Sequence, residues 1–432
     1  MSPHHCPALL ISAPASGQGK TSFTAALARL HRRAGRRVRV FKTGPDFLDP
    51  MVLACAAGTP VLQLDLWMGG EPEVRARLHA AAAEADLILV EGMMGLFDGV
   101  PSAADLAQTL GLPVLAVIDA NALAQSFGAI ALGLARYRPQ LSFAGVAGNR
   151  VASTWHTRLL RESLPPDLLW FGALSQSSEG ALPERHLGLV AAAELDDLDA
   201  RINTLADGLA ASLGGCLPLP EPVEFAPALL PFVEPWLRCR RIAIARDAAF
   251  CFVYAANIEL LLQAGAQLIE FSPLAGHALP ECDALWLPGG YPELHLQALA
   301  ARTDLMAQLH AHVQAGKPLL AECGGLLALL THLQDAAGQG ASMAGLIPGA
   351  ARVGTRLAGL GLQQVDLPEG RLRGHSFHYA EAVIGLAPLA HALDPNGAPT
   401  REAIYRVRRL TASFVHFYFP SNPLAACRLF ME

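Results

Sequence analysis

Short apolar runs alternate with helix-length segments through the first half of the chain. Each run is bounded by turn residues, a pattern typical of βαβ units whose strands are buried on both faces of a parallel sheet. The pattern predicts a helix over residues 20–33 and strands over residues 8–13, 38–42, 86–91, 113–119 and 143–148. We therefore expect an α/β domain with a parallel sheet in this half of the chain.

A second alternating series follows a stretch that is rich in proline. Proline removes backbone donors and interrupts helices and strands, so residues 214–237 are predicted to form a linker. Beyond it, the pattern predicts strands over residues 241–245, 267–271, 284–288 and 318–322, a helix over 326–333, and β-structure over 374–383 and 413–419. We expect two α/β domains, over residues 1–213 and 238–432.

Composition and charge restrict the classes of function. The length suits two domains of about 200 residues each, and the apolar content of 52% is far from that of a disordered chain. A net charge of −6 without a basic run argues against a nucleic-acid partner. The sequence contains no run of about 18 apolar residues, so we expect no membrane-spanning helix. The eight cysteines are scattered, which predicts reduced thiols. The N-terminus has no signal-peptide features, so we expect a cytoplasmic location.

A glycine-rich loop lies between the first predicted strand and the helix that follows it. The loop has the sequence APASGQGKT. Gly17 and Gly19 allow backbone N–H groups to turn inward, and the helix N-terminus adds its positive end, so the loop is suited to phosphates. Lys20 would reach the β- and γ-phosphates of a nucleotide, and the Thr21 hydroxyl can ligate Mg²⁺. Pro14 departs from the usual pattern, which has glycine six residues before the lysine.

Charged residues follow two further strands of the same predicted sheet. Lys42 and Asp46 lie at the end of the second strand, and Glu91 ends the third. Ligands of open parallel sheets bind beyond the carboxyl ends of the strands. We therefore expect Thr21, Asp46 and Glu91 to converge on one Mg²⁺ ion, with Lys42 as a second cation for the nucleotide. The alternative is that these acids are helix caps or solvated loop residues.

A cysteine occupies a tight turn in the second half of the chain. Cys323 follows an apolar strand and precedes the predicted helix, in the sequence AECGG. This is the arrangement of a nucleophile elbow, in which the turn lifts the thiol above the sheet and the N–H of Gly324 faces an oxyanion. Gly289 and Gly290, at the end of another predicted strand, are a second source of oxyanion donors.

Three histidines compete for the role of the base that activates this thiol. His416 lies in β-rich sequence near the C-terminus, and His375 and His378 lie in the segment GHSFHYAE. A Cys–His pair requires proximity in space, which spacing along the chain does not decide, so all three stay open at this point.

In their order along the chain, these motifs closely resemble those of the cobyrinate or hydrogenobyrinate a,c-diamide synthases of corrinoid biosynthesis. The resemblance covers nearly the whole chain and rests on the segments APASGQGKT, FKTGPDFLDP, LDLWMGG, EGMMGLFDG, RHLGLV, ARDAAFCFVY, PGGYPEL, AECGG, GHSFHY and FVHFYFPSNP. It implies a dethiobiotin-synthetase-like N-terminal domain, with a P-loop on a parallel sheet. It also implies a C-terminal, class I-like glutamine amidotransferase domain of the cobyrinate and cobyric acid type.

The resemblance also assigns roles to particular residues. Cys323 would be the glutaminase nucleophile, and His416 the base that activates it. Ordinary class I amidotransferases carry a Glu two residues past this His, where this chain has Tyr418, which fits the subfamily that lacks the acid. Leu53 stands where the family usually has His, and Gln63 where it often has Asn.

The reaction implied by the resemblance uses both domains. ATP, with Mg²⁺, would phosphorylate a substrate carboxylate, and ammonia released from glutamine would displace the phosphate. The substrate would be a corrinoid polycarboxylate amidated at its a and c acetates, with Arg150 and Arg185 as candidates to bind its carboxylates. Asp98, in the loop GMMGLFDG, could orient the ammonia or take its proton, or could cap its own turn. Small molecules are the expected partners, and a homodimer is the assembly considered.

Two rival interpretations remain open. Within the class, the chain could amidate nickel sirohydrochlorin, or it could be a cobyric acid synthase, which is normally longer and amidates four positions. Outside the class, the N-terminal half alone would suit a P-loop ATPase switch of the partitioning type. The elbow at Cys323 distinguishes the two classes, because such a switch needs no glutaminase.

Overall fold

The computed structural model describes residues 2–176, 180–185, 188–189 and 194–431. The chain divides into two compact units, unit 1 (Met1–Leu230) and unit 2 (Pro231–Glu432). This division falls within the proline-rich stretch that the sequence predicted as a linker. In the described part of the chain, no helix is long and apolar enough to cross a membrane.

Unit 1 is built on a parallel sheet with the strand order β3-β2-β4-β1-β5-β6-β7. Its central strands are almost wholly buried, which explains their continuous apolar sequence. The predicted strands of this half are confirmed, with ends that differ by a few residues. The strands are β1 (His4–Ser12), β2 (Val38–Thr43), β3 (Leu62–Leu64), β4 (Leu87–Glu91), β5 (Val114–Asp119), β6 (Phe143–Val151) and β7 (Leu169–Ser175).

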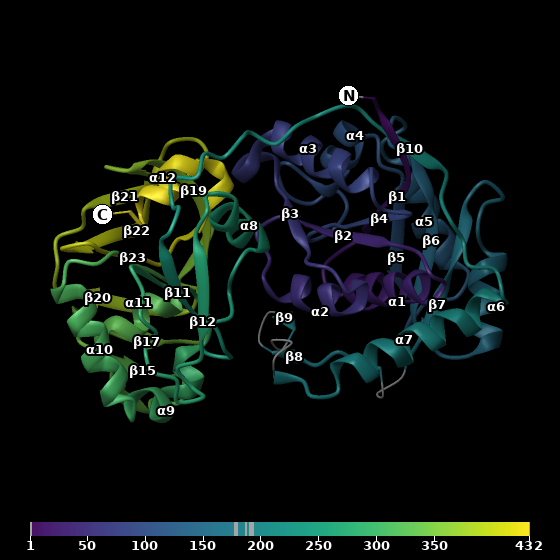
Figure 1. The fold of residues 1–432 in the computed structure, drawn as a ribbon. Coiled ribbons are helices and arrows are strands. Elements are labelled where there is room, and N and C mark those ends of the chain that lie inside the picture. The colour runs from purple at the N-terminus through teal and green to yellow at the C-terminus, as the bar shows by residue number, and fades with distance from the viewer. Residues whose placement is uncertain (1, 177–179, 186–187, 190–193, 432) are drawn as a thin grey trace. The chain divides into compact units, whose positions relative to one another are not determined.

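Helices cover both faces of this sheet (Figure 1). One face carries α1, α2 and α7, whose apolar side chains, including Phe23, Val52 and Ile202, pack with the sheet in one core. The bounds of α1 confirm the predicted helix. The helices of unit 1 are α1 (Lys20–Arg33), α2 (Leu48–Ala57), a π-helical turn η1 (Leu66–Gly70), α3 (Glu71–Ala82), α4 (Ala103–Leu110), α5 (Ser126–Arg136), α6 (Thr154–Glu162) and α7 (Leu198–Leu213). A small antiparallel pair joins β8 (Glu184–Arg185) and β9 (Gly188–Leu189).

Part of the proline-rich stretch belongs to unit 1. Residues Pro222–Phe225 form β10, which pairs antiparallel with the first residues of β1. Strand β10 pairs with β1 outside the main strand path, and an edge position tolerates a proline that cannot donate to a ladder. The expectation that proline would exclude a strand from residues 214–237 is therefore wrong for these four residues.

Unit 2 contains a mixed sheet with the order β12-β11-β13-β14-β23-β22-β21-β18-β19-β24. The first five strands of this order pair in parallel, and the rest pair antiparallel. The parallel strands are β11 (Arg241–Ala245), β12 (Gln267–Phe271), β13 (Ala284–Leu287), β14 (Leu319–Glu322) and β23 (Leu410–Ser413). The remaining strands are β18 (Gly359–Leu367), β19 (Gly370–His378), β21 (Ala390–Leu393), β22 (Pro399–Val407) and β24 (His416–Tyr418).

The segment after Cys323 differs from its prediction. The apolar run 326–333 was expected to be one helix, but α11 (Gly324–Leu329) ends after six residues and β15 (Leu330–Gln334) begins at once. A short apolar run suits a buried strand as well as a helix, and pairing with two neighbouring strands decided the outcome. The neighbours belong to a second sheet, β16-β15-β17-β20, with β16 (Gly340–Ser342), β17 (Ile347–Val353) and β20 (Ala380–Ile384).

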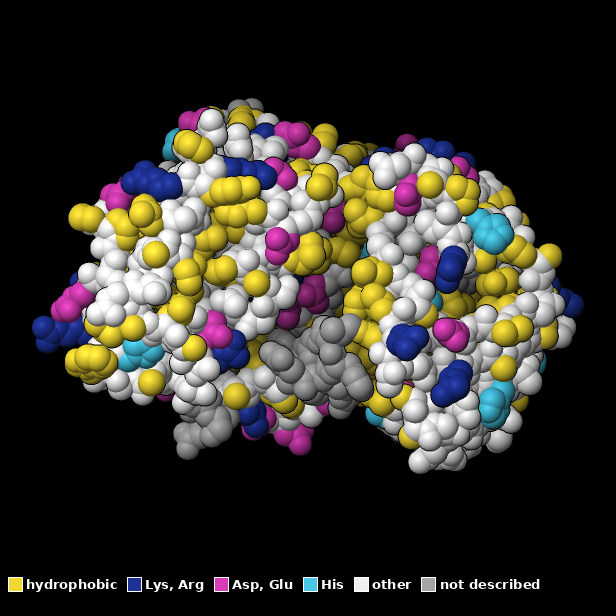
Figure 2. All heavy atoms as spheres, turned by 180° about the vertical axis from the view of Figure 1, so that it is seen from behind, with side chains coloured by type: hydrophobic (Ala, Val, Ile, Leu, Met, Phe, Trp, Pro, Cys, Tyr) yellow, Lys and Arg dark blue, Asp and Glu magenta, His cyan; other side chains and the backbone are white. Residues whose placement is uncertain are grey.

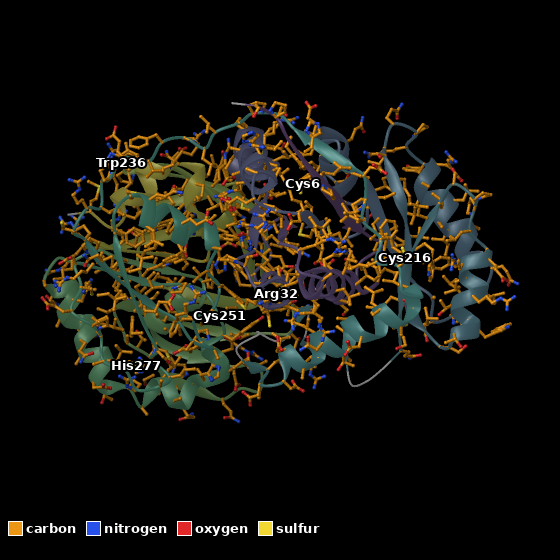
Figure 3. All side chains as sticks on the ribbon, turned by 45° about the vertical axis from the view of Figure 1, so that its right-hand side comes forward. Cys6, Arg32, Cys216, Trp236, Cys251 and His277 are labelled. Atoms are coloured by element: carbon orange, nitrogen blue, oxygen red, sulfur yellow. The ribbon has the colours of Figure 1, made fainter. Side chains whose placement is uncertain are left out.

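The helices of unit 2 are short. They are α8 (Ala255–Gln263), a 3₁₀ turn η3 (Pro292–His295), α9 (Leu296–Ala300), α10 (Thr303–Gln314), α11, a 3₁₀ turn η4 (Phe419–Ser421) and α12 (Pro423–Arg428). All eight cysteines of the chain are free thiols, and Figure 3 shows Cys6 and Cys216 well apart within unit 1. On the face shown in Figure 2, the described Lys and Arg side chains are interspersed with Asp and Glu and gather in no continuous patch.

Candidate active sites

The glycine-rich loop of unit 1 has the conformation that its sequence predicts. Gly17 and Gly19 have positive φ values of 74° and 88°, and Gly19 caps the N-terminus of α1. A Cβ at Gly19 would lie 2.0 Å from Nδ2 of Asn149, so only glycine fits there. The same Nδ2 donates to the Gln18 carbonyl at 2.9 Å, and the Gln18 side chain accepts from the Asp119 amide at 2.9 Å. The loop is therefore fastened to the ends of β5 and β6.

Lys20 links this loop to the loop that carries Asp98. Its Nζ donates to the Met94 carbonyl at 2.6 Å, and burial, together with the charge of Lys42, lowers its pKa. Asp98 is exposed, and its Oδ2 accepts from the Gly95 amide at 3.1 Å, closing the turn in which it lies. The charge of Asp98 nevertheless acts on Lys20, where it opposes the fall in pKa. Asp98 thus caps its own turn and remains accessible near the phosphate loop.

A buried lysine stands among the acids at the strand ends. The ammonium of Lys42 lies 2.6 Å from Asp49, 2.7 Å from Glu91 and 3.6 Å from Asp46. Burial acts to lower its pKa, but the three carboxylates outweigh burial and raise that pKa well above its ordinary value. Thr21 joins the cluster by donating to Oε1 of Glu91 at 3.1 Å. The structure therefore brings together Thr21, Lys42, Asp46 and Glu91 as predicted.

Asp49 is a member of this cluster that the sequence argument missed. It is the second acid of the segment FKTGPDFLDP, three residues after Asp46, and lies in the first turn of α2. Burial acts to raise its pKa, but the Lys42 charge and hydrogen bonds from its neighbours, including Thr21, lower it to about 2. Burial and the negative charge of Asp49 raise the pKa of Asp46 to about 7. Asp46 also accepts from the Leu48 and Asp49 amides, so it caps α2 as well.

The cluster contains oxygen atoms that suit Mg²⁺, although its shape differs from a closed metal cage. The described residues form no group of three or more His, Cys, Asp or Glu side chains that could hold a metal ion. Mg²⁺ sites, however, commonly use one or two carboxylates together with phosphate oxygens and water. Oε2 of Glu91 is buried and has no hydrogen-bond partner among the described residues, and Oε1 accepts from the Thr21 hydroxyl. These oxygen atoms of Thr21 and Glu91 are of the kind that a divalent cation binds, so the two residues fit Mg²⁺.

Two arginines, Arg150 and Arg185, were suggested to bind substrate carboxylates, and the structure describes the side-chain contacts of the first alone. Arg150 forms an ion pair with Asp119 at 2.5 Å and donates to the Gly17 carbonyl at 3.0 Å, so it supports the phosphate loop. The side chain of Arg185 lies outside the part of the chain that the structure describes.

Cys323 occupies the strained turn of a nucleophile elbow. It follows β14 and precedes α11, with φ 47° and ψ −104°, a conformation that non-glycine residues rarely adopt. Its amide donates to the Ser413 carbonyl at 2.7 Å, which anchors the turn to β23. The thiol is buried, with 5% of the residue exposed.

The predicted oxyanion glycines lie against this turn. A Cβ on Gly324 would lie 2.9 Å from the Gly290 amide nitrogen, and a Cβ on Gly289 would lie 2.2 Å from Cε1 of His416. The Gly289 carbonyl also accepts from the Phe252 amide at 2.9 Å, which ties the loop to a neighbouring segment. The glycine pair after β13 therefore contacts both the elbow and His416.

The geometry favours His416 over its two rivals. His375 is its strand partner and stacks on it, with ring centroids 5.1 Å apart and planes at 21°, and its Nδ1 contacts the Tyr254 hydroxyl at 2.8 Å. His378 instead contacts Glu402 at 3.0 Å and stacks on Phe414. Of the three, His416 is the one that lies against Gly289 beside the elbow.

Burial keeps the thiol and the imidazole neutral. Burial, followed by the charges of Glu293 and Glu402, raises the pKa of Cys323 well above its ordinary value. Burial, followed by His375 and His378, lowers the pKa of His416 well below its ordinary value. A neutral imidazole has a ring nitrogen able to accept a proton, but the raised pKa of the thiol and the lowered pKa of the imidazole both oppose its transfer from Cys323 to His416 in this state.

Comparisons with known families agree with both halves of this description. Residues 9–187 match the family described as the CobQ/CobB/MinD/ParA nucleotide binding domain. Residues 241–424 match the family described as the CobB/CobQ-like glutamine amidotransferase domain. The phosphate loop lies in the first match and Cys323 in the second. The predicted fold class is confirmed.

Relatives match the chain over almost its whole length. The hydrogenobyrinate a,c-diamide synthase of Pseudomonas aeruginosa is 59% identical over 430 residues, covering 99% of this chain and 98% of the relative. The enzyme of the same name from Stutzerimonas stutzeri is also 59% identical, covering 99% of each chain. The cobyrinate a,c-diamide synthase of Herminiimonas arsenicoxydans is 45% identical, covering 98% of this chain and 96% of the relative. The chain therefore belongs to the family of hydrogenobyrinate and cobyrinate a,c-diamide synthases.

Proposed function

We propose that this chain amidates the a and c acetate carboxylates of a corrinoid, with ATP as the phosphate donor and glutamine as the nitrogen source. The observation that carries the proposal is that one chain holds both a phosphate loop with a strand-end acid cluster and a strained cysteine elbow beside a histidine. Hydrogenobyrinate is the first substrate to test, because the two relatives that are 59% identical bear that name.

Unit 1 would activate the corrinoid carboxylate. The loop from Gly17 to Thr21 would hold the β- and γ-phosphates of ATP through its N–H groups, and the Lys20 ammonium would exchange its carbonyl partner for phosphate oxygens. The carboxylate would then attack the γ-phosphorus, ADP would leave, and an acyl phosphate would form. Ammonia would attack the acyl carbon, and the phosphate would leave with the C–O bonding electrons.

Thr21 and Glu91 would hold Mg²⁺ at this site. The ion, when bound, would neutralise the charge that develops on the phosphate oxygens. Lys42 would keep Asp49 ionised and would hold Asp46 toward the same point, because its ammonium lies 2.6 Å from Asp49 and 3.6 Å from Asp46. Asp98, in the exposed turn beyond the strand end, would orient the ammonia or take its proton.

Unit 2 would supply the ammonia. His416 would take the thiol proton of Cys323, and the sulfur would attack the carboxamide carbon of glutamine. The N–H groups of Gly290 and Gly324 would face the resulting oxyanion. His416 would return the proton to the departing nitrogen, so that ammonia leaves and a thioester remains, which water would hydrolyse to glutamate and free thiol. A cytoplasmic location and a homodimer remain predictions.

The proposal is tested by the product. Purified protein incubated with ATP, Mg²⁺, glutamine and hydrogenobyrinate is expected to give a diamide through a monoamide, each step removing one negative charge and changing the mass. Ion-exchange chromatography with mass spectrometry follows both steps. Turnover of nickel sirohydrochlorin, or of a corrinoid already amidated at a and c, without turnover of hydrogenobyrinate would assign the chain to one of the rival activities.

Two substitutions should separate the half-reactions. Cys323→Ser is expected to abolish glutamine-supported synthesis and to leave synthesis from ammonium chloride measurable, because the thiol serves the release of ammonia alone. Lys20→Ala is expected to slow synthesis from either nitrogen source by about 100-fold or more, as loss of a charge-stabilising donor typically does. A folded Cys323→Ser protein that uses neither nitrogen source would contradict the division of roles between the two units.

Gly289→Ala should damage the glutaminase site. The added Cβ would lie 2.2 Å from Cε1 of His416, so the imidazole must move, and a displacement of this kind should slow glutamine hydrolysis by about tenfold or more. Gly354→Ala is a matched control, because its Cβ would meet no atom of another residue nearer than 3.7 Å. Glutamate release measures both variants, and equal rates would remove His416 from the role of base.

Asp98→Asn should slow the amide-forming step. The substitution keeps the shape and an acceptor for the Gly95 amide but removes the charge. We expect near-normal ATP binding and diamide formation slowed by about tenfold, the lower end of acid–base effects. Diamide formation at the parent rate would leave Asp98 with its turn-capping role alone.

A further inference from the structure

Glu322 is a buried acid to which the proposed chemistry gives no role. It directly precedes Cys323, ends β14 in the middle of the sheet of unit 2, and is 2% exposed. Burial raises its pKa to about 8, an effect that its hydrogen-bond donors oppose. An acid is rarely kept in such a place unless its oxygens are engaged.

Both oxygens of Glu322 are engaged, and by partners from two other catalytic segments. Oε1 accepts from the Phe417 amide at 2.8 Å, and Phe417 directly follows His416. Oε2 accepts from Nε1 of Trp286 at 2.9 Å, and Trp286 lies on β13, the strand that leads to the Gly289–Gly290 loop. One carboxylate therefore touches the segments that carry the nucleophile, the base and the oxyanion glycines.

We infer that Glu322 is the positioning residue for His416: it holds the backbone of β24 at Phe417 and so sets the imidazole against the Cys323 elbow. This inference rests on the proposed function, since it assumes that His416 and Cys323 act together on glutamine. The Phe417 amide and the Trp286 indole occupy its two oxygens, so Glu322 would act through the strand that carries the base.

The local structure explains why β24 needs the hydrogen bond from Phe417 to Glu322. Strand β24 has three residues and stands at the end of the sheet order, where it pairs with β19. A short strand at a sheet edge has few ladder bonds to fix its position. The acid that usually orients the histidine is replaced by Tyr418, whose ring is buried edge-on against Tyr254 at a centroid distance of 5.5 Å. Glu322 reaches β24 from the sheet centre and supplies the missing constraint.

The two donors make a specific test possible. A carboxamide offers one acceptor oxygen and one donor group, whereas both partners of Glu322 are donors and suit the ionised carboxylate, which prevails above about pH 8, where the comparison is made. Glu322→Gln therefore leaves either the Phe417 amide or the Trp286 indole facing another donor. Trp286→Phe removes one of these donors, so in the double variant the carboxamide can turn its oxygen to the Phe417 amide.

The experiment compares glutamine hydrolysis by the full-length wild type, Glu322→Gln, Trp286→Phe and the double variant. We expect Glu322→Gln to lower kcat for glutamine by about tenfold or more, with little change in KM and none in ammonia-supported synthesis. The double variant should recover the rate of Trp286→Phe alone. Asp283→Asn is the matched control, because Asp283 also accepts a backbone N–H, that of Arg241 at 2.8 Å, but at the far end of β13. It should hydrolyse glutamine at the wild-type rate.

The possible outcomes separate this inference from the proposed function. A wild type that releases no glutamate would overturn the proposed function and the role of Glu322 with it. With an active wild type, a folded Glu322→Gln protein of unchanged kcat would overturn the inference alone. If Glu322→Gln does not fold, the double variant decides: a rate equal to that of Trp286→Phe supports the inference, and a tenfold lower rate overturns it.

Discussion

Parallel pairing of buried strands is the constraint on which both candidate sites depend. Such pairing brings the carboxyl ends of neighbouring strands to one edge of a sheet, and strands covered on both faces leave that edge as the place for polar side chains. In unit 1 the edge gathers the loops after β1, β2 and β4; in unit 2 it gathers those after β13 and β14. Functional residues from distant parts of the sequence therefore lie close together at that edge, and no long loop is needed to bring them there.

The two edges hold their buried ionisable groups in opposite states. In unit 1, Lys42 stays charged because three carboxylates surround it, and those carboxylates in turn are held by Lys42. In unit 2, burial is the largest cause of the pKa shifts of Cys323 and His416 and favours the neutral form of each. The first arrangement suits a polyanionic nucleotide, and the second leaves both the thiol and the imidazole uncharged.

Local sequence predicted the parts of the sites that depend on local backbone. The glycines of the phosphate loop and the elbow at Cys323 were found because each turn requires particular residues next to a strand and a helix. Contacts across the fold were harder to predict. Asp49 was missed because a helical acid near a strand end looks like a cap. Spacing along the chain left His416 beside His375 and His378, and it was the family resemblance, and then the packing at Gly289, that favoured His416. Residues 330–333 of the run 326–333 were assigned to a helix and form a strand, because the apolar pattern suits a helix and a buried strand equally.

The scarcity of lysine bears on the chemistry in a further way. Lysine occurs at three positions: Lys20 and Lys42 are buried at the phosphate site, and the ammonium of Lys317 donates to the Cys282 carbonyl at 2.7 Å. The positive charge of the surface is therefore carried by guanidinium groups, which stay protonated and are poor nucleophiles. An acyl phosphate reacts with free amines as readily as with ammonia. A chain with so few exposed amines offers its own activated intermediate little to acylate by mistake.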